Sequence, residues 1–259
     1  MTARLCLTVD NLGLALEVGR GRAARPDPGE PGLRSGVDGL LTLFDELGLR
    51  STFFVEGWNG LHHPDVITRI AGRGHEIGLH GWVHERWAKE LDDRAREQLL
   101  FDGTAALRAA GAEPRAFRAP GGYRGTRTAP VLAELGYRID SSIDDGAGQP
   151  GDPQSIGMLP GGLVSLPWTW DMIDYWQYVS RPDGTITPDR LVAHWQGLLA
   201  GAAKTGGLVT LIVHPFVTGV DQERLEALRR VLVFALQTPG LTVGSAGEAA
   251  QAYLTPAPS

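Results

Sequence analysis

Two histidines four positions apart are the first residues in this sequence whose type and spacing suggest chemistry. They stand in the run His80-Gly-Trp-Val-His84, and this spacing predicts a helical turn that presents both imidazoles to one metal ion. His80 also closes an apolar run typical of a buried strand, so its ring is not expected to face bulk water. Asp10 closes another such run and completes a set of two histidines and one carboxylate, with positions open for water. The sequence therefore predicts a metal site at Asp10, His80 and His84.

Two further residues at strand ends are candidates for proton transfer and positioning. His214 follows a run, 208–213, that is apolar except for one threonine. We expect it to act as a general acid facing the metal, the alternative being a capping or core histidine. Arg118 precedes a rigid Pro-Gly-Gly loop and is expected to hold Asp10 ionised and oriented, the alternative being a tether for a loop carboxylate. The predicted catalytic residues are Asp10, Arg118 and His214.

Polar and aromatic side chains near the same strand ends are candidates for the substrate cleft. The run 168–176 concentrates aromatic rings and carboxylates, which suits a cleft wall about as well as a core. We expect substrate contacts from Asn11, Glu56, Trp82, Tyr123, Trp168, Asp171 and Trp176. The remaining histidines, His62, His63, His75 and His194, are interpreted as structural or surface residues.

The candidate catalytic, metal and substrate residues can form one site only in a fold whose strand ends lie close together on one side. Short apolar runs alternate with amphipathic stretches along the whole chain, which predicts repeated βα units in a barrel or a wound sheet, and catalytic groups of βα barrels lie at the carboxyl ends of the strands. The predicted strands are 5–9, 51–55, 76–79, 116–118, 137–139, 164–166, 208–213 and 241–243. The predicted helices are 36–47, 64–73, 92–110, 128–135, 188–205, 221–237 and 246–253. Two long segments rich in glycine and proline, 13–35 and 144–162, are expected to be functional or mobile loops.

Composition excludes several classes of function. The 259 residues carry a net charge of -6, with lysine only at 89 and 204, so we expect no nucleic-acid or membrane partner. The single cysteine, Cys6, gives neither a disulfide framework nor a thiolate cluster. No apolar run reaches the roughly 18 residues of a membrane span, and no signal segment is evident at the start. We expect one cytoplasmic domain, 1–259, with a small-molecule substrate; the sequence is compatible with a homo-oligomer.

Four motifs together resemble the polysaccharide deacetylase family, carbohydrate esterase family 4, with its NodB homology domain. They are Thr8-Val-Asp10-Asn11, His80-x-x-x-His84, Arg118-x-Pro120 and Leu211-Ile-Val-His214. Runs such as Gly74-His-Glu-Ile-Gly78 and Leu166-Pro-Trp-Thr-Trp-Asp171 resemble its intracellular branch, which contains peptidoglycan-deacetylase-like and allantoinase-like enzymes. The resemblance extends from residue 5 to about 253. It implies a single distorted (β/α) barrel of about seven strands, with long loops over the carboxyl-terminal rim.

The resemblance also implies roles for individual residues. In the family, two histidines and an aspartate hold a divalent metal, commonly zinc, a second aspartate is the base and a histidine is the acid. By position, His80 and His84 resemble the ligands, Asp10 the base, Arg118 its support and His214 the acid. The family's ligand aspartate is replaced here by Asn11.

This replacement leaves three interpretations open. Asn11 ligates weakly through its amide oxygen, or Asp10 ligates and a group such as Glu56 or Asp171 takes the proton, or no metal binds. The leading hypothesis is a metal-dependent hydrolase that cleaves a C-N bond, either an N-deacetylase or a related amidohydrolase. A ligand-binding pseudoenzyme, or a non-hydrolytic reaction in the same cleft, is the alternative.

Overall fold

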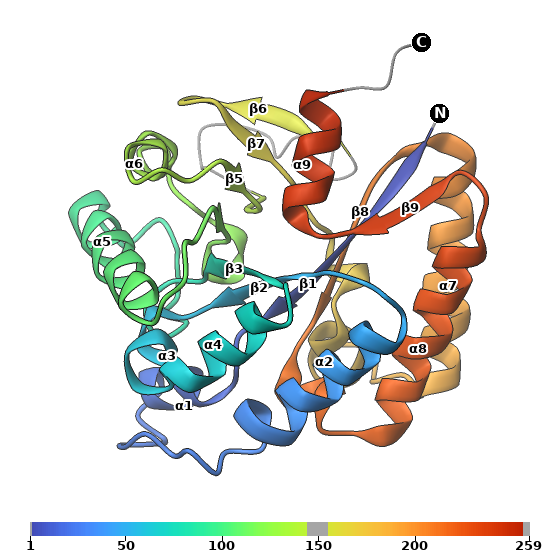
Figure 1. The fold of residues 1–259 in the computed structure, drawn as a ribbon, viewed down its shortest axis with the longest axis horizontal. Helices are drawn as coiled ribbons and strands as arrows, with labels where there is room; N and C mark the ends of the chain where they lie inside the picture. Colours follow the sequence, from blue (N-terminus) through green and yellow to red (C-terminus); the bar gives the residue numbers. More distant parts are fainter. Residues whose placement is uncertain (1, 144–154, 256–259) are drawn as a thin grey trace.

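The strand β1, Ala3–Asp10, pairs with three other strands in a curled and mostly parallel sheet (Figure 1). It pairs with β8, Gly207–Val213, on one side, and with β2, Thr52–Val55, and β9, Leu241–Gly244, on the other. Nearly every residue of β1 is buried, as expected for a parallel strand covered on both faces. Val9 is in register with Val213, so the next residues, Asp10 and His214, emerge at the same level of the sheet.

The remaining strands extend the sheet in the order β6-β7-β5-β4-β3-β2-β1-β8. Their bounds are β3 Glu76–Leu79, β4 Ala116–Phe117, β5 Ile139–Asp140, β6 Gly157–Leu159 and β7 Leu163–Ser165. Only β6 pairs in the antiparallel sense among the described strands. An isolated parallel bridge joins Ile173, beyond β7, to Ile212 of β8 and brings the two edges of the sheet together. The predicted distorted α/β barrel is confirmed.

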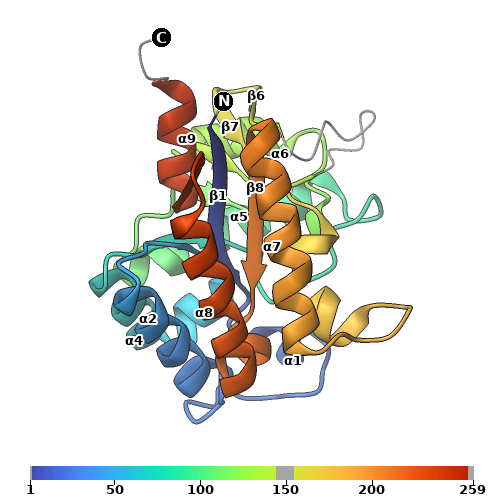
Figure 2. The same ribbon diagram turned by 90° about the vertical axis from the view of Figure 1, so that its right-hand side faces the viewer.

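Helices cover the outside of the sheet; α7 runs alongside β8 and β1, and α8 packs beside α7 and β9 (Figure 2). The α-helices are α1 Leu14–Gly19, α2 Val37–Glu46, α3 Gly57–His62, α4 Pro64–Gly72, α5 Asp93–Ala109, α6 Thr128–Glu134, α7 Pro188–Thr205, α8 Gln222–Gln237 and α9 Ala246–Leu254. Shorter 3-10 and π turns are η1 Gly32–Gly36, η2 Pro120–Gly122, η3 Trp170–Met172, η4 Trp176–Ser180 and η5 Pro215–Gly219. Asp92, Thr187, Asp221 and Ser245 cap the helices that they precede, which satisfies otherwise unpaired N–H groups.

The structure is a computed structural model and describes residues 2–143 and 155–255; part of the predicted loop 144–162 lies outside them. The segment 13–35 is not entirely irregular, since it contains α1 and most of η1. The helical turn predicted for 80–84 is wrong: the segment is an irregular turn in which His84 has a left-handed backbone, φ 57°. No helix in the described ranges is long and apolar enough to cross a membrane.

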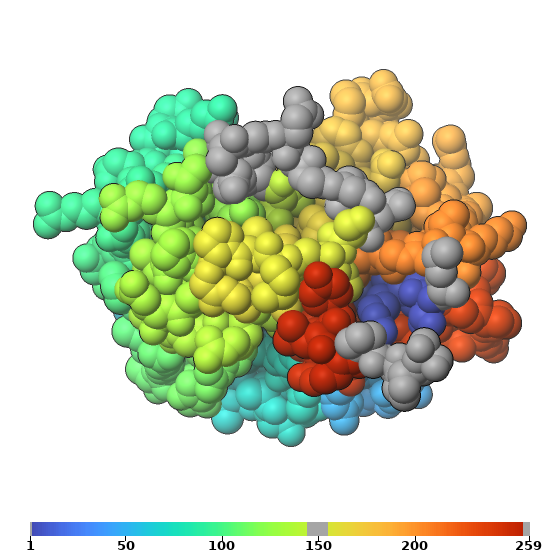
Figure 3. Space-filling view, turned by 90° about the horizontal axis from the view of Figure 1, so that it is seen from above, coloured from blue at the N-terminus to red at the C-terminus, as the bar shows by residue number. Residues whose placement is uncertain are grey.

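The amino-terminal end of the barrel is closed by α9 (Figure 3). The Glu76 carboxylate accepts a hydrogen bond from Ser245 Oγ at 2.7 Å and another from Gly247 N at 3.0 Å. These bonds fix the start of α9 to the start of β3. A site that must admit substrate is therefore expected at the opposite end, where the strands finish.

Candidate active site

Asp10 and Arg118 form a buried ion pair at the carboxyl end of the sheet. Arg118 Nη1 donates to Asp10 Oδ1 at 2.5 Å and also to Thr8 Oγ1 at 2.9 Å. Arg118 Nη2 donates to Ser141 Oγ at 2.8 Å, and the guanidinium lies 4.2 Å from the centre of the Phe54 ring. Because every side of the guanidinium is held, the Asp10 carboxylate has a fixed orientation with Oδ2 left free of Arg118.

His80 and His84 lie directly beside this carboxylate. His80 Nδ1 donates to the carbonyl oxygen of Arg118 at 2.8 Å, which leaves Nε2 as an acceptor that faces Asp10 Oδ2 at 3.8 Å. The ring of His84 lies 4.9 Å from that of His80, centre to centre. Burial lowers the pKa of each histidine to about 3. Both rings are therefore neutral at physiological pH, which is the form that binds a metal.

The left-handed conformation of His84 is held by its neighbour in the chain. The carboxylate of Glu85 accepts hydrogen bonds from Trp82 N at 2.9 Å and from Val83 N at 2.8 Å. It also accepts one from Trp87 Nε1 at 2.8 Å. Positive φ is uncommon for residues other than glycine, although histidine adopts it more readily than most, and such residues are often found at functional sites.

His214 is paired with a buried carboxylate that the sequence analysis did not select. Asp174 Oδ1 lies 2.6 Å from His214 Nδ1, and Asp174 Oδ2 accepts from His214 N at 2.8 Å and from Thr218 Oγ1 at 2.6 Å. Burial alone lowers the pKa of His214, but the charge and hydrogen bond of Asp174, with the nearby charges of Asp10 and Glu56, raise it above its ordinary value. His214 is thus held with Nε2 as its free nitrogen and in a state that favours protonation.

Glu56 and Asn11 lie on the other side of Asp10. Glu56 is fully buried and its Oε2 accepts from Asn59 Nδ2 at 2.8 Å and from Leu12 N at 3.3 Å. Burial raises the pKa of Glu56 to about 7. Asn11 has a left-handed backbone, φ 52°, and its Oδ1 accepts from Gly13 N at 2.8 Å. The amide oxygen that stands in place of the family's carboxylate is thus engaged with the backbone.

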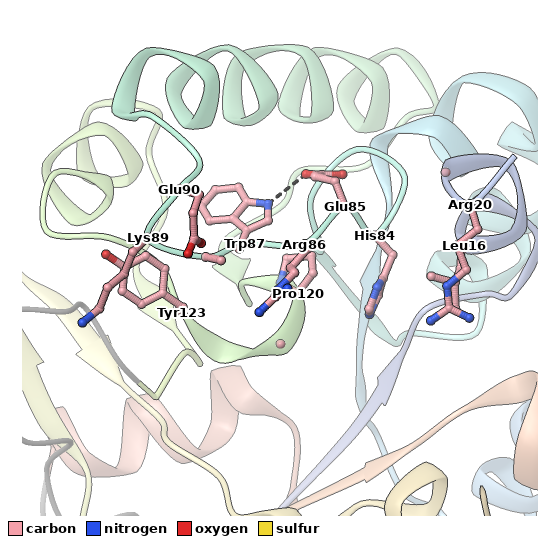
Figure 4. A pocket seen from close by; sticks show the side chains of 13 residues that line it. Leu16, Arg20, His84, Glu85, Arg86, Trp87, Lys89, Glu90, Pro120 and Tyr123 are labelled. Carbon is pink, nitrogen blue, oxygen red and sulfur yellow. Dashed lines mark hydrogen bonds between the residues drawn. The ribbon is translucent and has the colours of Figure 1, made fainter. Parts of the chain in front are cut away.

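The other predicted substrate residues differ in their exposure. Trp168 is buried and donates from Nε1 to Ser141 O at 3.0 Å, while Trp82 and Trp176 are half-buried. Asp171 is exposed. Tyr123 lines a pocket of about 750 Å³ beside His84 (Figure 4). The lining of this pocket contains Tyr123 and none of the other six predicted substrate residues.

The donor types around His80 fit a zinc ion, but the ligand set is incomplete. Neutral imidazole and carboxylate are preferred zinc ligands. Across residues 2–143 and 155–255, however, no three side chains of His, Cys, Asp or Glu are grouped closely enough to hold a metal. His80 and His84 are in place with Asp10 beside them, and the position of the third family ligand is occupied by Asn11.

Comparisons with known proteins decide the family. A family model described as polysaccharide deacetylase matches residues 27–139. A crystal structure from Mycobacterium smegmatis assigned to the polysaccharide deacetylases is 30% identical, with a TM-score of 0.81. This similarity covers 96% of the present chain and 89% of that protein. The chain belongs to the polysaccharide deacetylase family.

More distant relatives agree with this assignment. Puue allantoinase has the same fold, with 20% identity and a TM-score of 0.74 over 99% of this chain and 92% of that protein. A peptidoglycan-N-acetylglucosamine deacetylase of Bacillus cereus is 34% identical over 83 residues, which is 32% of this chain and 30% of the relative. The chain matches between 30 and 47% of the length of three such curated relatives.

Most residues of this polysaccharide deacetylase site can be predicted from the sequence, but Asp174 cannot. Asp10 ends a strand, and His80, Arg118 and His214 each follow one directly, so position alone singles them out. Asp174 lies in the same aromatic run as Asp171 and carries no distinguishing spacing. The turn η3 exposes Asp171 and buries Asp174, and nothing in the residue types predicts which carboxylate turns inward.

Proposed function

We propose that this protein hydrolyses the C-N bond of an N-acyl group, adding water to release a carboxylic acid and an amine. The observation that carries the proposal is that two buried acid-base groups stand at the same level on the neighbouring strands β1 and β8. Asp10, at the end of β1, is held by Arg118. His214, directly after β8, is held by Asp174. The deacetylase names of the sequence relatives support acetyl as the acyl group.

Each of the two groups has one free atom for chemistry. Asp10 Oδ1 is occupied by Arg118, so Oδ2 is the oxygen available to take a proton from water. His214 Nδ1 is occupied by Asp174, so Nε2 is the nitrogen available to protonate the departing amine. A general base and a general acid each contribute roughly 10²- to 10⁴-fold to such a reaction.

A divalent cofactor belongs to the proposal because the donor types suit it. His80 and His84 would hold such an ion, which would supply Lewis acidity at the acyl carbonyl and lower the pKa of water. If Asp10 Oδ2 were its third ligand, a group such as Glu56 would take the proton instead. Arg118 serves Asp10 in either role, because its hydrogen bond to Oδ1 fixes the orientation of the carboxylate. Zinc, the small size of the substrate and a cytoplasmic location stay predictions of the sequence.

The proposal is tested by measuring amine released from N-acetylglucosamine oligomers, with metal-stripped protein and after zinc is restored. We expect activity to depend on zinc. His214→Ala should lower kcat by roughly 10²- to 10⁴-fold without changing metal content, and His62→Ala, which alters an exposed histidine, should not. Equal kcat for His214→Ala and the parent protein would remove His214 from the chemistry. Binding of the oligomers without amine release would favour the ligand-binding alternative.

A further inference from the structure

The pocket beside His84 is built from three segments that are separate in sequence. It is lined by the end of α1, by residues 84–90 and by the turn 120–123. Its volume of about 750 Å³ lies within the range of small-molecule sites. His84 belongs both to this lining and to the histidine pair beside Asp10. A molecule in the pocket therefore lies next to the proposed reaction centre.

The pocket gathers positive charge in an acidic protein. Arg20, Arg86 and Lys89 line it and are exposed, although the chain as a whole carries a net charge of -6. Arg20 lies 3.9 Å from Glu17. Within the described ranges, neither Arg86 nor Lys89 has a carboxylate at ion-pair distance, and Lys89 is one of only two lysines in the sequence.

The acidic side chains of the lining do not cancel this charge. The Glu85 carboxylate is already held by two backbone N–H groups and by Trp87 Nε1, the bond drawn in Figure 4. Glu90 is the remaining carboxylate of the lining. The lining thus has three cations against two carboxylates, an excess of one positive charge. Figure 4 also shows that the side chains of Arg20, His84 and Arg86 extend toward the same side.

We propose that this pocket binds an anionic group, a carboxylate or a phosphate, carried by the same substrate whose N-acyl group lies beside His80. This inference rests on the proposed function and names its substrate class as anionic N-acyl compounds. Arg86 supplies a planar fork suited to two oxygens of one anion, and Lys89 adds a mobile point charge. Tyr123 and Pro120 supply the apolar wall that such pockets need.

The test is equilibrium binding of three sugars to the zinc-supplemented protein, measured by calorimetry. The probes are N-acetylglucosamine, which is neutral, N-acetylglucosamine 6-phosphate and N-acetylmuramic acid, which carries a carboxylate. We expect at least one anionic sugar to bind about tenfold more tightly than the neutral one, and this preference to weaken as salt is added. The anion that binds more tightly identifies the group that the pocket takes.

Variants assign the preference to the pocket. Arg86→Gln combined with Lys89→Gln should abolish it, and Arg86→Lys should retain part of it because the charge remains. The matched controls are Arg190→Gln and Lys204→Gln, which remove one exposed arginine and the other lysine from α7; both should keep the full preference. Equal affinities for all three sugars, or a preference that survives the double variant, overturns the proposal. Binding needs no turnover, so these results stand whether or not hydrolysis occurs.

Discussion

The Asp174 carboxylate sets the protonation of the proposed acid. It raises the pKa of His214 by its charge and by its hydrogen bond to Nδ1. A general acid works only while protonated, so activity should fall as pH rises through the pKa of His214. Asp174→Asn removes the charge and should move this alkaline fall in kcat to lower pH. The measurement is the dependence of kcat on pH in both proteins.

The matched control for this shift is Asp183→Asn, which neutralises an exposed carboxylate in the loop before α7. It should leave the alkaline fall where it is in the parent protein. If Asp174→Asn only lowers the rate, with an unmoved pH profile, Asp174 acts by holding the ring in place and not through its charge.

Asn11 distinguishes this chain from the family pattern, and its replacement is a direct test of the metal site. Asn11→Asp should keep the left-handed backbone, which both residues tolerate, and one oxygen can still accept from Gly13 N. The other oxygen adds a negative charge, so we expect zinc to bind roughly tenfold more tightly, about 1.4 kcal/mol. Selectivity should shift toward simple N-acetyl substrates.

Competition with a chelator measures the zinc affinity, and comparison of N-acetylglucosamine oligomers with cyclic ureides measures the selectivity. Unchanged values for both quantities would place Asn11 outside the coordination sphere. The site would then be built around Asp10, which already lies 3.8 Å from His80 Nε2.

At the scale of elements, the turn that follows His214 depends on a close approach between two backbones. An added Cβ at Gly219, in η5, would overlap the carbonyl oxygen of Gly36, in η1. Neither backbone can move without disturbing the neighbouring helices. Gly219→Ala should therefore destabilise the fold by about 1 to 3 kcal/mol and lower kcat, because the carbonyl of His214 anchors η5.

Urea unfolding measures this cost, and α7 offers the matched control. Gly197 lies inside that helix with no atom within 4 Å of an added Cβ. Gly197→Ala should stabilise the protein by about 0.5 to 1 kcal/mol, the difference in helix propensity. A Gly219→Ala protein as stable as the parent would show that the η1 and η5 backbones can separate freely.

The helices and strands show which local sequence signals are sufficient to predict an element. All eight predicted strands overlap observed ones, because buried parallel strands are short apolar runs bounded by polar residues. The missed helices α1 and α3 are six residues long and lack a side-chain N-cap, so they carry neither periodicity nor a start signal. The strand β6, three residues long, pairs with β7 in the antiparallel sense, and its own short sequence does not predict that pairing.

At the scale of the molecule, the position of the reactive residues at strand ends predicted that they lie on one rim of the barrel, since all described strands but one run parallel. It predicted the partnership of Arg118 with Asp10 but not the partner of His214. The bond from His214 to Asp174 joins residues that the closure of the sheet brings together, whereas Arg118 and Ser141 follow neighbouring strands. The same closure buries ionisable groups at both ends, and these groups should give opposite pH dependences of stability.

His75 is the group at the start of β3, away from the catalytic rim. Its Nδ1 accepts from Ser51 N at 3.2 Å, its ring packs against Phe53, and burial lowers its pKa to about 4. The unfolded chain, with a pKa near 6.5, then binds more protons between pH 6.5 and 4, so stability is lost as pH falls. His75→Asn should reduce the loss of unfolding free energy between pH 6.5 and 4 by about 2 to 3 kcal/mol. His62→Asn, which changes an exposed histidine, should leave that loss as it is in the parent protein. Unfolding curves at several pH values measure the loss, and equal values for the two variants would reject the prediction.

Glu56, at the catalytic rim, should act in the opposite sense. Its pKa is raised by burial from 4.5 to about 7, so the folded protein holds an extra proton between these values. The stability that this proton provides is complete below pH 4.5 and is lost as pH rises through 7, by about 3 kcal/mol. Glu56→Gln cannot lose a proton and should flatten that decline, while Glu134→Gln, at an exposed site on α6, should leave it unchanged. If Glu56→Gln and the parent protein lose stability in parallel from pH 5 to 8, Glu56 is already ionised in the fold. The carboxylate would then be available beside Asp10 as the alternative base.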